Sequence, residues 1–205
     1  INQKPLTLGI DIVVHSGTKY LGGHSDLCCG VAVTSHTNAE KILHLARQLG
    51  GSLDATSCYL LERSLKTLAL RVRQQTANAG RLAEYLAANA KVGNVFYPGM
   101  PDAPGHAIAK AQMSGFGAML SFELDAARVH TDTFLHQLAL IRPAVSLGGV
   151  ETTICAPAVT SHAKMSPEER QRIGVTDGLL RLSVGIEDHD DLITDIRQAL
   201  EQAAA

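Results

Sequence analysis

A lysine flanked by hydroxyl residues follows a short apolar run near the start of the sequence. Ser16 and Thr18 come just ahead of Lys19, in the stretch V-V-H-S-G-T-K-Y-L-G-G. Two short hydroxyls at this spacing can bind a phosphate group, and a lysine held in a dry loop loses its proton more easily than a surface lysine. This combination is what a Schiff base with pyridoxal phosphate (PLP) requires, although a solvated lysine in a polar turn would also fit so short a string.

The elements that must position this lysine can be read from hydrophobic periodicity. The apolar runs 10–15 and 29–34 predict strands that are covered on both faces. Apolar residues at helical spacing predict a helix over 38–49 and one long helix from 57 to about 88. After a loop rich in proline and glycine, we expect strands over 118–124, 141–145 and 179–184, and helices over 128–140 and 190–203.

These elements predict an α/β fold with two parts. Residues 1–88 form an α/β part that carries the lysine and the long helix, and residues 89–205 form a smaller α+β part. The chain reaches a predicted buried strand within about ten residues, which suggests that it is a fragment.

Composition narrows the classes of function. The chain has 205 residues, 45% of them apolar, and a formal net charge of −2, so it offers no basic field for nucleic acid or an anionic membrane. No apolar run is long enough to span a membrane, and no signal peptide is recognised. The four cysteines form no C-x-x-C pair, which favours reduced thiols and a cytoplasmic location. His15 and His24 lack the neighbouring ligands of a metal site, so no metal is expected.

Longer segments are far more specific than the lysine loop alone. D-I-V-V-H-S-G-T-K-Y-L-G-G-H-S-D resembles the cofactor-lysine segment of the Cys/Met metabolism family of PLP enzymes, which includes cystathionine γ-lyase, cystathionine γ-synthase and methionine γ-lyase. V-S-L-G-G-V-E-T-T-I-C-A-P-A-V-T-S-H and G-L-L-R-L-S-V-G-I-E-D resemble two further segments of that family, in the same order. The resemblance covers essentially all of the chain and implies the carboxy-terminal part of a fold-type I PLP-dependent transferase.

The resemblance implies a role for each matched residue. Lys19 would bind PLP and move protons on the substrate, with Ser16 and Thr18 near the cofactor phosphate. Arg181 would bind the substrate α-carboxylate, a task for which a bidentate guanidinium suits better than an ammonium, and Ser146 would lie beside it. The remaining implied substrate-site positions are Glu151, which would line the way in, and Ser161, close to the arginine.

The family pattern also shows what this sequence lacks. Members are about twice as long, and their amino-terminal half supplies the ring stacked on the cofactor, a phosphate loop and the aspartate that pairs with the pyridine nitrogen. The chain alone is therefore expected to be inactive and to need that half. Family members form tetramers built from catalytic dimers, so a homo-oligomer is expected here. Arg142-Pro143 stands where the family commonly has apolar or small residues, which puts substrate access in question.

Three functions remain open. The first is a PLP-dependent carbon–sulfur lyase that cleaves a sulfur amino acid such as cystathionine, cysteine or methionine by β- or γ-elimination. The second is a transferase that uses the same site to exchange the γ-substituent of a homoserine derivative. The third, of another class, is a non-catalytic scaffold that kept the fold, although the presence of Lys19, Ser16, Thr18 and Arg181 argues against it.

Overall fold

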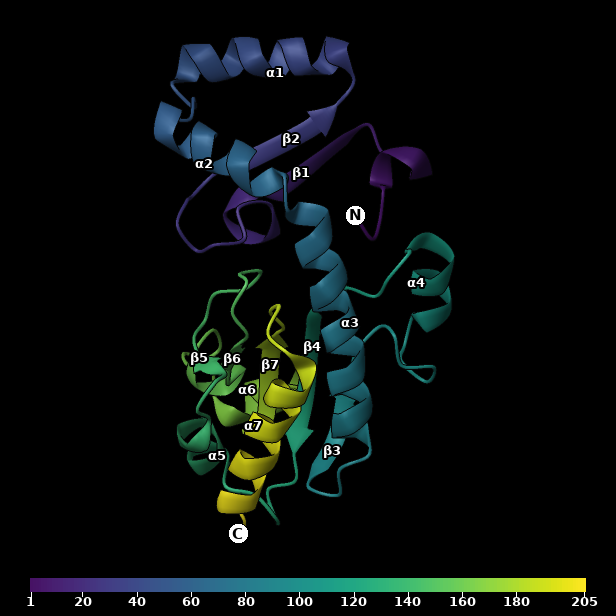
Figure 1. Ribbon diagram of the computed structural model, residues 1–205, viewed down its shortest axis with the longest axis vertical. Helices are drawn as coiled ribbons and strands as arrows, with labels where there is room; N and C mark the ends of the chain where they lie inside the picture. The colour runs from purple at the N-terminus through teal and green to yellow at the C-terminus, as the bar shows by residue number, and fades with distance from the viewer.

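The computed structural model describes all 205 residues and shows two sheets joined by one long helix (Figure 1). The hairpin of the first part and its helices lie at the top of Figure 1, and the five-stranded sheet lies at the bottom. Helix α3 (Leu68–Ala87) runs from one part into the other. None of the helices is long and apolar enough to cross a membrane.

The first part is a two-stranded antiparallel sheet with helices on its outside. Its elements are η1 (Pro5–Leu8), β1 (Ile12–Ser16), η2 (Gly17–Leu21), β2 (Gly30–Thr34), α1 (His36–Leu49) and α2 (Ala55–Leu65). Ser35 caps α1 by accepting a hydrogen bond from the backbone N–H of Asn38, and Asp54 caps α2 in the same way. The predicted strands and the predicted helix over 38–49 are therefore confirmed within two residues.

The single long helix that periodicity predicts over 57–88 is wrong, because the chain breaks at Lys66 and Thr67 between α2 and α3. Thr67 has φ −106° and ψ 0°, and its hydroxyl donates to the carbonyl of Ser64 at 3.2 Å. A threonine hydroxyl that bonds to nearby backbone offers the chain an alternative to the helix, which accounts for the break.

The second part is a five-stranded sheet in the order β3-β4-β7-β6-β5, antiparallel except for the β5–β6 pair. Its elements are β3 (Val92–Phe96), α4 (His106–Gln112), β4 (Met119–Leu124), α5 (Thr131–Gln137), β5 (Arg142–Pro143), β6 (Thr153–Cys155), η3 (Pro157–Val159), α6 (Pro167–Arg172), β7 (Leu179–Ser183) and α7 (His189–Gln202). Alternate residues of β4 are buried, and Phe122 packs edge-on against Phe134 of α5. Leu82 and Ile196 bring α3 and α7 onto this core, which is formed by the second part and the carboxy-terminal half of α3.

The differences from prediction in this part concern short or edge elements. The helix expected over 128–140 is shortened to α5, and the strand expected over 141–145 shrinks to the two residues of β5. Pro143 has no N–H to donate, so the strand survives only at the sheet edge. Strands β3 and β6 were not predicted, because the glycine and asparagine of β3 are poor strand formers and β6 spans three residues.

The hairpin of β1 and β2 is uncovered in this chain, contrary to the expectation that both of its strands are covered on both faces. Val14 is 75% exposed, and Ile12 and Val33 are exposed as well. Leu27 is the only buried hydrophobic side chain among residues 1–63. A two-stranded hairpin is only marginally stable by itself, so contacts with the second part must hold it.

One such contact joins the turn that carries Lys19 to the loop between β5 and β6. Gly148 has φ +79° and lies so close to this turn that a Cβ atom would be 2.9 Å from the backbone nitrogen of Tyr20 and 3.1 Å from the Cβ of Lys19. Its own N–H donates to the hydroxyl of Ser183 at the end of β7, at 2.9 Å. Only glycine fits this position without moving one of the two loops.

The segment just before β5 is held by a buried carboxylate. Asp195 of α7 is 5% exposed and accepts hydrogen bonds from the backbone N–H groups of Ala139, Leu140 and Ile141 at 2.8–3.0 Å. Gln198 donates a fourth bond at 3.1 Å. The carboxylate thus fixes the chain just before β5, from which the loop to Gly148 starts.

We expect Asp195→Ala to lower the free energy of unfolding by about 2–4 kcal/mol, because it leaves three backbone N–H donors, that of Ile141 buried, without their acceptor. Urea denaturation followed by circular dichroism would measure the loss. Glu201→Ala, at an exposed position of the same helix, should change the stability by less than about 0.5 kcal/mol. Equal stabilities of the two variants would contradict the assigned role of Asp195.

We expect Gly148→Ala to destabilise the protein by roughly 2–4 kcal/mol, because the new methyl group must push the two loops apart as well as adopt a left-handed backbone. Gly105→Ala is the matched control, since Gly105 has φ +81° and no atom within 4 Å of the added Cβ. The control should cost only about 1 kcal/mol. The same urea titration would compare them, and losses of the same size would show that the loops do not press on Gly148.

Candidate functional site

Lys19 lies in a tight turn that follows directly on strand β1. The N–H of Gly22 donates to the carbonyl of Gly17 at 2.8 Å, and the N–H of Gly23 donates to the carbonyl of Lys19 at 2.7 Å. The lysine itself departs from helical geometry, with φ −89° and ψ −124°. Its side chain is half-buried and makes no hydrogen bond or ion pair with protein. The turn therefore presents a lysine amine that has no protein partner.

The two hydroxyls beside the lysine differ in what they contact. Thr18 accepts a hydrogen bond from the backbone N–H of Cys29 at 3.0 Å, so its side chain ties the turn to the start of β2. The N–H of Gly17 donates to the carbonyl of Cys29 at 2.8 Å and strengthens the same link. Ser16 is exposed, and its hydroxyl makes no hydrogen bond to protein. Of the two, Ser16 has the freer group for a ligand.

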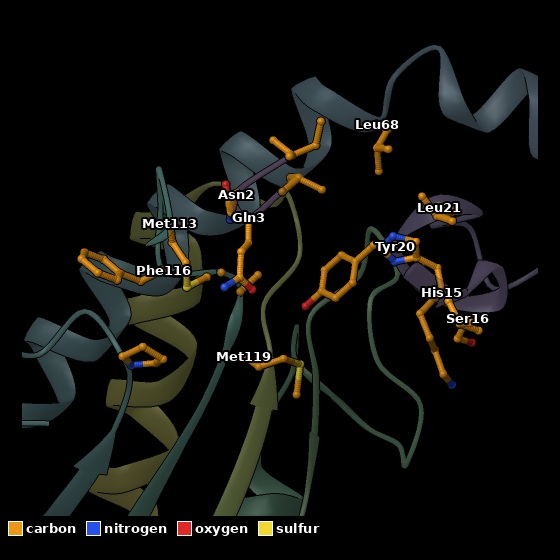
Figure 2. Close-up of a pocket in the computed structure, with 17 residues that line it drawn as sticks. Asn2, Gln3, His15, Ser16, Tyr20, Leu21, Leu68, Met113, Phe116 and Met119 are labelled. Atoms are coloured by element: carbon orange, nitrogen blue, oxygen red, sulfur yellow. The ribbon is translucent and has the colours of Figure 1, made fainter. Parts of the chain in front are cut away.

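A cavity of about 520 Å³ opens beside this turn, and Lys19 and Ser16 line it. Figure 2 shows His15, Ser16, Tyr20 and Leu21 on one side of the cavity, with Phe116 and other residues of the second part on the opposite side. A volume of this size is typical of sites for small molecules and cofactors. The cavity thus lies between the two parts of the chain.

Tyr20, to which sequence analysis assigned no role, projects into this cavity. Its ring reaches from the lysine turn toward the side of Met119, as Figure 2 shows. The phenol oxygen is buried and has no hydrogen-bond partner, and burial raises the pKa of the phenol. A buried polar atom without a partner at the wall of a cavity that also holds a free lysine and a free serine fits a polar group such as PLP. Its position next to Lys19 was the one available signal.

The second end of the site is built on the middle of the sheet. Arg181 lies in β7, and its Nη2 donates to the carbonyls of Val145 and Ser146 at 2.7 and 3.2 Å. The Nε of Arg181 is buried and has no partner. The structure therefore brings Arg181 and the Ser146 loop together, and it leaves guanidinium donors for an anion such as a carboxylate. Neither residue lines the cavity beside Lys19.

Gly148 joins the two ends. It lies two residues after Ser146 and packs directly on the backbone of Lys19 and Tyr20. Through this contact the loop that Arg181 binds also touches the lysine turn. The arrangement places the Lys19 amine at one end and a guanidinium with an unpartnered Nε at the other.

The other two predicted residues lie at the edge of this arrangement. Glu151 is exposed, and its carboxylate lies beside Gly149. Ser161 is exposed as well, and its hydroxyl is 2.9 Å from Nδ1 of His162. Neither side chain hydrogen-bonds to Arg181, so the structure gives no contact that would assign them to the substrate.

Arg71 is a second residue that sequence analysis missed. It is 5% exposed, forms no ion pair, and donates to the carbonyls of Tyr20 at 2.9 Å and Ser64 at 3.0 Å. Burial lowers the pKa of its guanidinium. An arginine among the apolar positions of a helix stripe was the signal for a buried, bonded cation.

The potential metal ligands of the chain lie elsewhere. Asp188, His189 and Asp190 have ligand atoms within 4.8 Å of one another at the start of α7. Asp188 caps that helix by accepting from the N–H of Asp190 at 2.8 Å. Capping accounts for these acidic residues.

Comparison with known proteins agrees with this arrangement. The family model described as Cys/Met metabolism PLP-dependent enzyme matches residues 1–201. A cystathionine β-lyase of Lactococcus lactis subsp. cremoris is 48% identical over 201 residues, which cover 98% of this chain and 53% of the relative.

Solved structures of related enzymes match the chain over nearly its whole length. The crystal structure of cystathionine γ-lyase from Lactobacillus plantarum complexed with L-serine has a TM-score of 0.91 at 43% identity, and the match covers 100% of this chain and 54% of that one. The structure of cystathionine γ-synthase from Xanthomonas oryzae pv. oryzae in complex with cystathionine has a TM-score of 0.90 at 42% identity, covering 98% and 52%.

The chain thus spans about half the length of the relatives that it matches. Lyases and a synthase match to nearly the same degree. The comparisons therefore identify the family but do not distinguish the lyase reaction from the synthase reaction. On the family model, the shared fold and the lysine turn, this chain belongs to the Cys/Met metabolism family of PLP-dependent enzymes.

Proposed function

We propose that the whole protein carrying this chain is a PLP-dependent carbon–sulfur lyase that acts on a sulfur amino acid. The observation that supports this most is the contact of Gly148 with the lysine turn, because it brings the reactive amine and the carboxylate-binding arginine into one site. Cystathionine, cysteine and methionine are the substrate types proposed. The net reaction consumes water and releases a keto acid, ammonia and a thiol, or hydrogen sulfide where the substrate is cysteine.

Each residue of the site has a proposed part in this reaction. PLP, when bound, supplies the electron sink that stabilises negative charge on the substrate α-carbon. Lys19 binds the cofactor and carries protons to and from the substrate carbons, since its amine is free of protein partners. Ser16 and Thr18 lie on the phosphate side. Arg181 and Ser146 bind the α-carboxylate and so orient the amino acid over the cofactor.

Glu151 and Ser161 remain proposals for the outer, substrate-side wall of the site. Both are exposed, and the carboxylate of Glu151 lies next to the Gly149 backbone, one residue from the Gly148 contact. A side chain there could select among substrate side chains without touching the reacting atoms.

The division of labour within the chain is also proposed. Residues 1–88 would be part of the large PLP-binding domain and residues 89–205 the small domain, since α3 ends at Ala87 and the second sheet begins at Val92. The exposed Ile12 and Val14 would be covered by the half of the family fold that this chain does not span. We expect a homo-oligomer, a dimer or tetramer, located in the cytoplasm.

The alternative within the family is a transferase that replaces the γ-substituent of a homoserine derivative. This alternative is supported by the similarity to a cystathionine γ-synthase, which is nearly as high as the similarity to the lyases. A non-catalytic scaffold is the alternative of another class.

We expect the whole protein to be yellow with bound PLP, and borohydride to bleach it and leave the label on Lys19. Tryptic digestion and mass spectrometry would locate the label. Lys19→Ala should lose the label and lower turnover by at least about a thousandfold, because it removes both the cofactor link and the proton carrier. Lys66→Ala, an exposed lysine on the same part, is the control. A protein that stays colourless with added PLP would support the scaffold instead.

We expect the whole protein to release a keto acid and ammonia from cystathionine or cysteine with no second substrate. A lactate dehydrogenase-type coupled assay or direct mass spectrometry of the keto acid would measure this. Turnover that appears only when an acyl-homoserine donor and a thiol are supplied together would contradict the lyase and establish the transferase.

A further inference from the structure

The buried face of α3 is polar where it passes between the two parts of the chain. Arg71, Gln75 and Asn78 are 5%, 0% and 1% exposed. Their spacing of four and three residues places them on one face of the helix, above the apolar Leu82 and Leu86 that enter the core. A helix with this position in the fold would more commonly bury apolar residues alone.

Each of the three side chains donates to the main chain of a different loop. Arg71 bonds to the carbonyls of Tyr20 and Leu21 in the lysine turn, at 2.9 and 3.4 Å. Gln75 bonds to the carbonyl of Gly149 at 2.7 Å, within the loop that follows Ser146.

Asn78 completes the row at the loop that follows Arg181. Its Nδ2 donates to the carbonyls of Gly185 and Glu187, at 3.1 and 2.8 Å. Glu187 in turn accepts a bond from the hydroxyl of Thr152 at 2.8 Å, so this loop is also tied to the start of β6. The three segments reached from α3 are the turn that carries Lys19, the loop that carries Ser146 and the loop that follows the strand of Arg181.

Burying the polar row of Arg71, Gln75 and Asn78 stabilises the fold less than burying apolar side chains at the same positions would. A buried polar group costs free energy unless it is hydrogen-bonded, and Gln75 leaves its Oε1 without a partner. What the row provides is direction, because a donated hydrogen bond fixes the position of its acceptor more closely than apolar contact does. The acceptors here are backbone carbonyls, so loop position is fixed whatever side chains the loops carry.

We propose that Arg71, Gln75 and Asn78 are positioning residues that set the separation and orientation of the lysine end and the carboxylate end of the site. The inference rests on the proposed function, which gives Lys19, Ser146 and Arg181 their roles. Arg71 governs the cofactor end, and Gln75 and Asn78 govern the substrate end. Gly23 supports the first assignment, because a Cβ there would lie against the Arg71 guanidinium, so the turn is shaped around it.

The test uses the whole protein and compares Arg71→Met with Gln75→Met. Arg71→Met should weaken PLP binding at least tenfold, change the visible spectrum of bound PLP and lower kcat by up to about a hundredfold, because the lysine turn loses its tie. Gln75→Met should raise KM for the amino acid about tenfold and leave the PLP spectrum unchanged, since one hydrogen bond to the Ser146 loop is lost.

Two further variants guard against loss of folding. Arg71→Lys keeps the charge and should restore part of the PLP affinity, because an ammonium can reach only some of the acceptors. Arg73→Met changes an exposed arginine two positions away on the same helix and should leave spectrum, kcat and KM unchanged. Hydrogen–deuterium exchange should rise over residues 17–23 in Arg71→Met and over 146–151 in Gln75→Met.

The outcomes separate this inference from the proposed function. If the wild type takes up no PLP, the proposed function fails, and the two exchange patterns alone decide whether the row positions its loops. If the wild type binds PLP but both variants merely lose stability, with wild-type spectrum and KM in the folded fraction, the row is structural and the inference is overturned. A split between spectrum and KM supports it, and equal changes of both quantities in both variants contradict it.

Discussion

The site depends on how closely two loops from different parts of the chain can approach. Gly148, with a left-handed φ of +79°, meets the backbone of Lys19 with no side chain between them, and Arg181 binds the carbonyl of Ser146 two residues earlier in the same loop. Any other residue would hold the loops apart by at least a methyl group and would also pay for its backbone geometry. A contact between main chains, and not a pair of reactive side chains, therefore brings the lysine end to the carboxylate end.

Helix α3 gives this contact a fixed frame. Its second half is anchored by Leu82 and Leu86 in the core, while its first half reaches the loops through buried donors. A helix is stiff over this length, so loops bonded to it at separate points keep their relative positions. The same helix thus serves packing at one end and loop placement at the other, which explains why its buried face changes from polar to apolar along its length.

Local patterns in the sequence predicted the parts of the site that local chemistry determines. The lysine turn, its hydroxyls and the strand before it follow from one short segment, and Arg181 with the Ser146 loop follow from two others; the structure places Arg181 against that loop. The two strands and helix α1 of the first part were also predicted, whereas α2 was merged with α3 into one helix. The contacts that could not be predicted join residues far apart in the sequence. Arg71 and Gln75 donate to carbonyls some 50 and 74 residues away, and hydrophobic periodicity does not reveal those carbonyls. The break at Thr67 was missed because the helical spacing of the leucines continues past it, although the Thr67 hydroxyl bonds to the carbonyl of Ser64.

The lysine end of the site has fewer buried apolar contacts than the carboxylate end and is therefore the less stable of the two. The carboxylate end is part of a five-stranded sheet with a continuous core. The hairpin whose strands flank the lysine turn exposes Ile12 and Val14, and Leu27, in the connection between those strands, is the only buried hydrophobic residue among residues 1–63. Segments with few buried apolar contacts open at low free-energy cost. In this chain the lysine turn is therefore held mainly from below, by the Arg71 guanidinium and the Gly148 contact, and from the side by the Thr18–Cys29 link. It follows that covering the exposed strands would stabilise the cofactor end far more than the carboxylate end, so that formation of a competent site is coupled to whatever completes the first part of the fold.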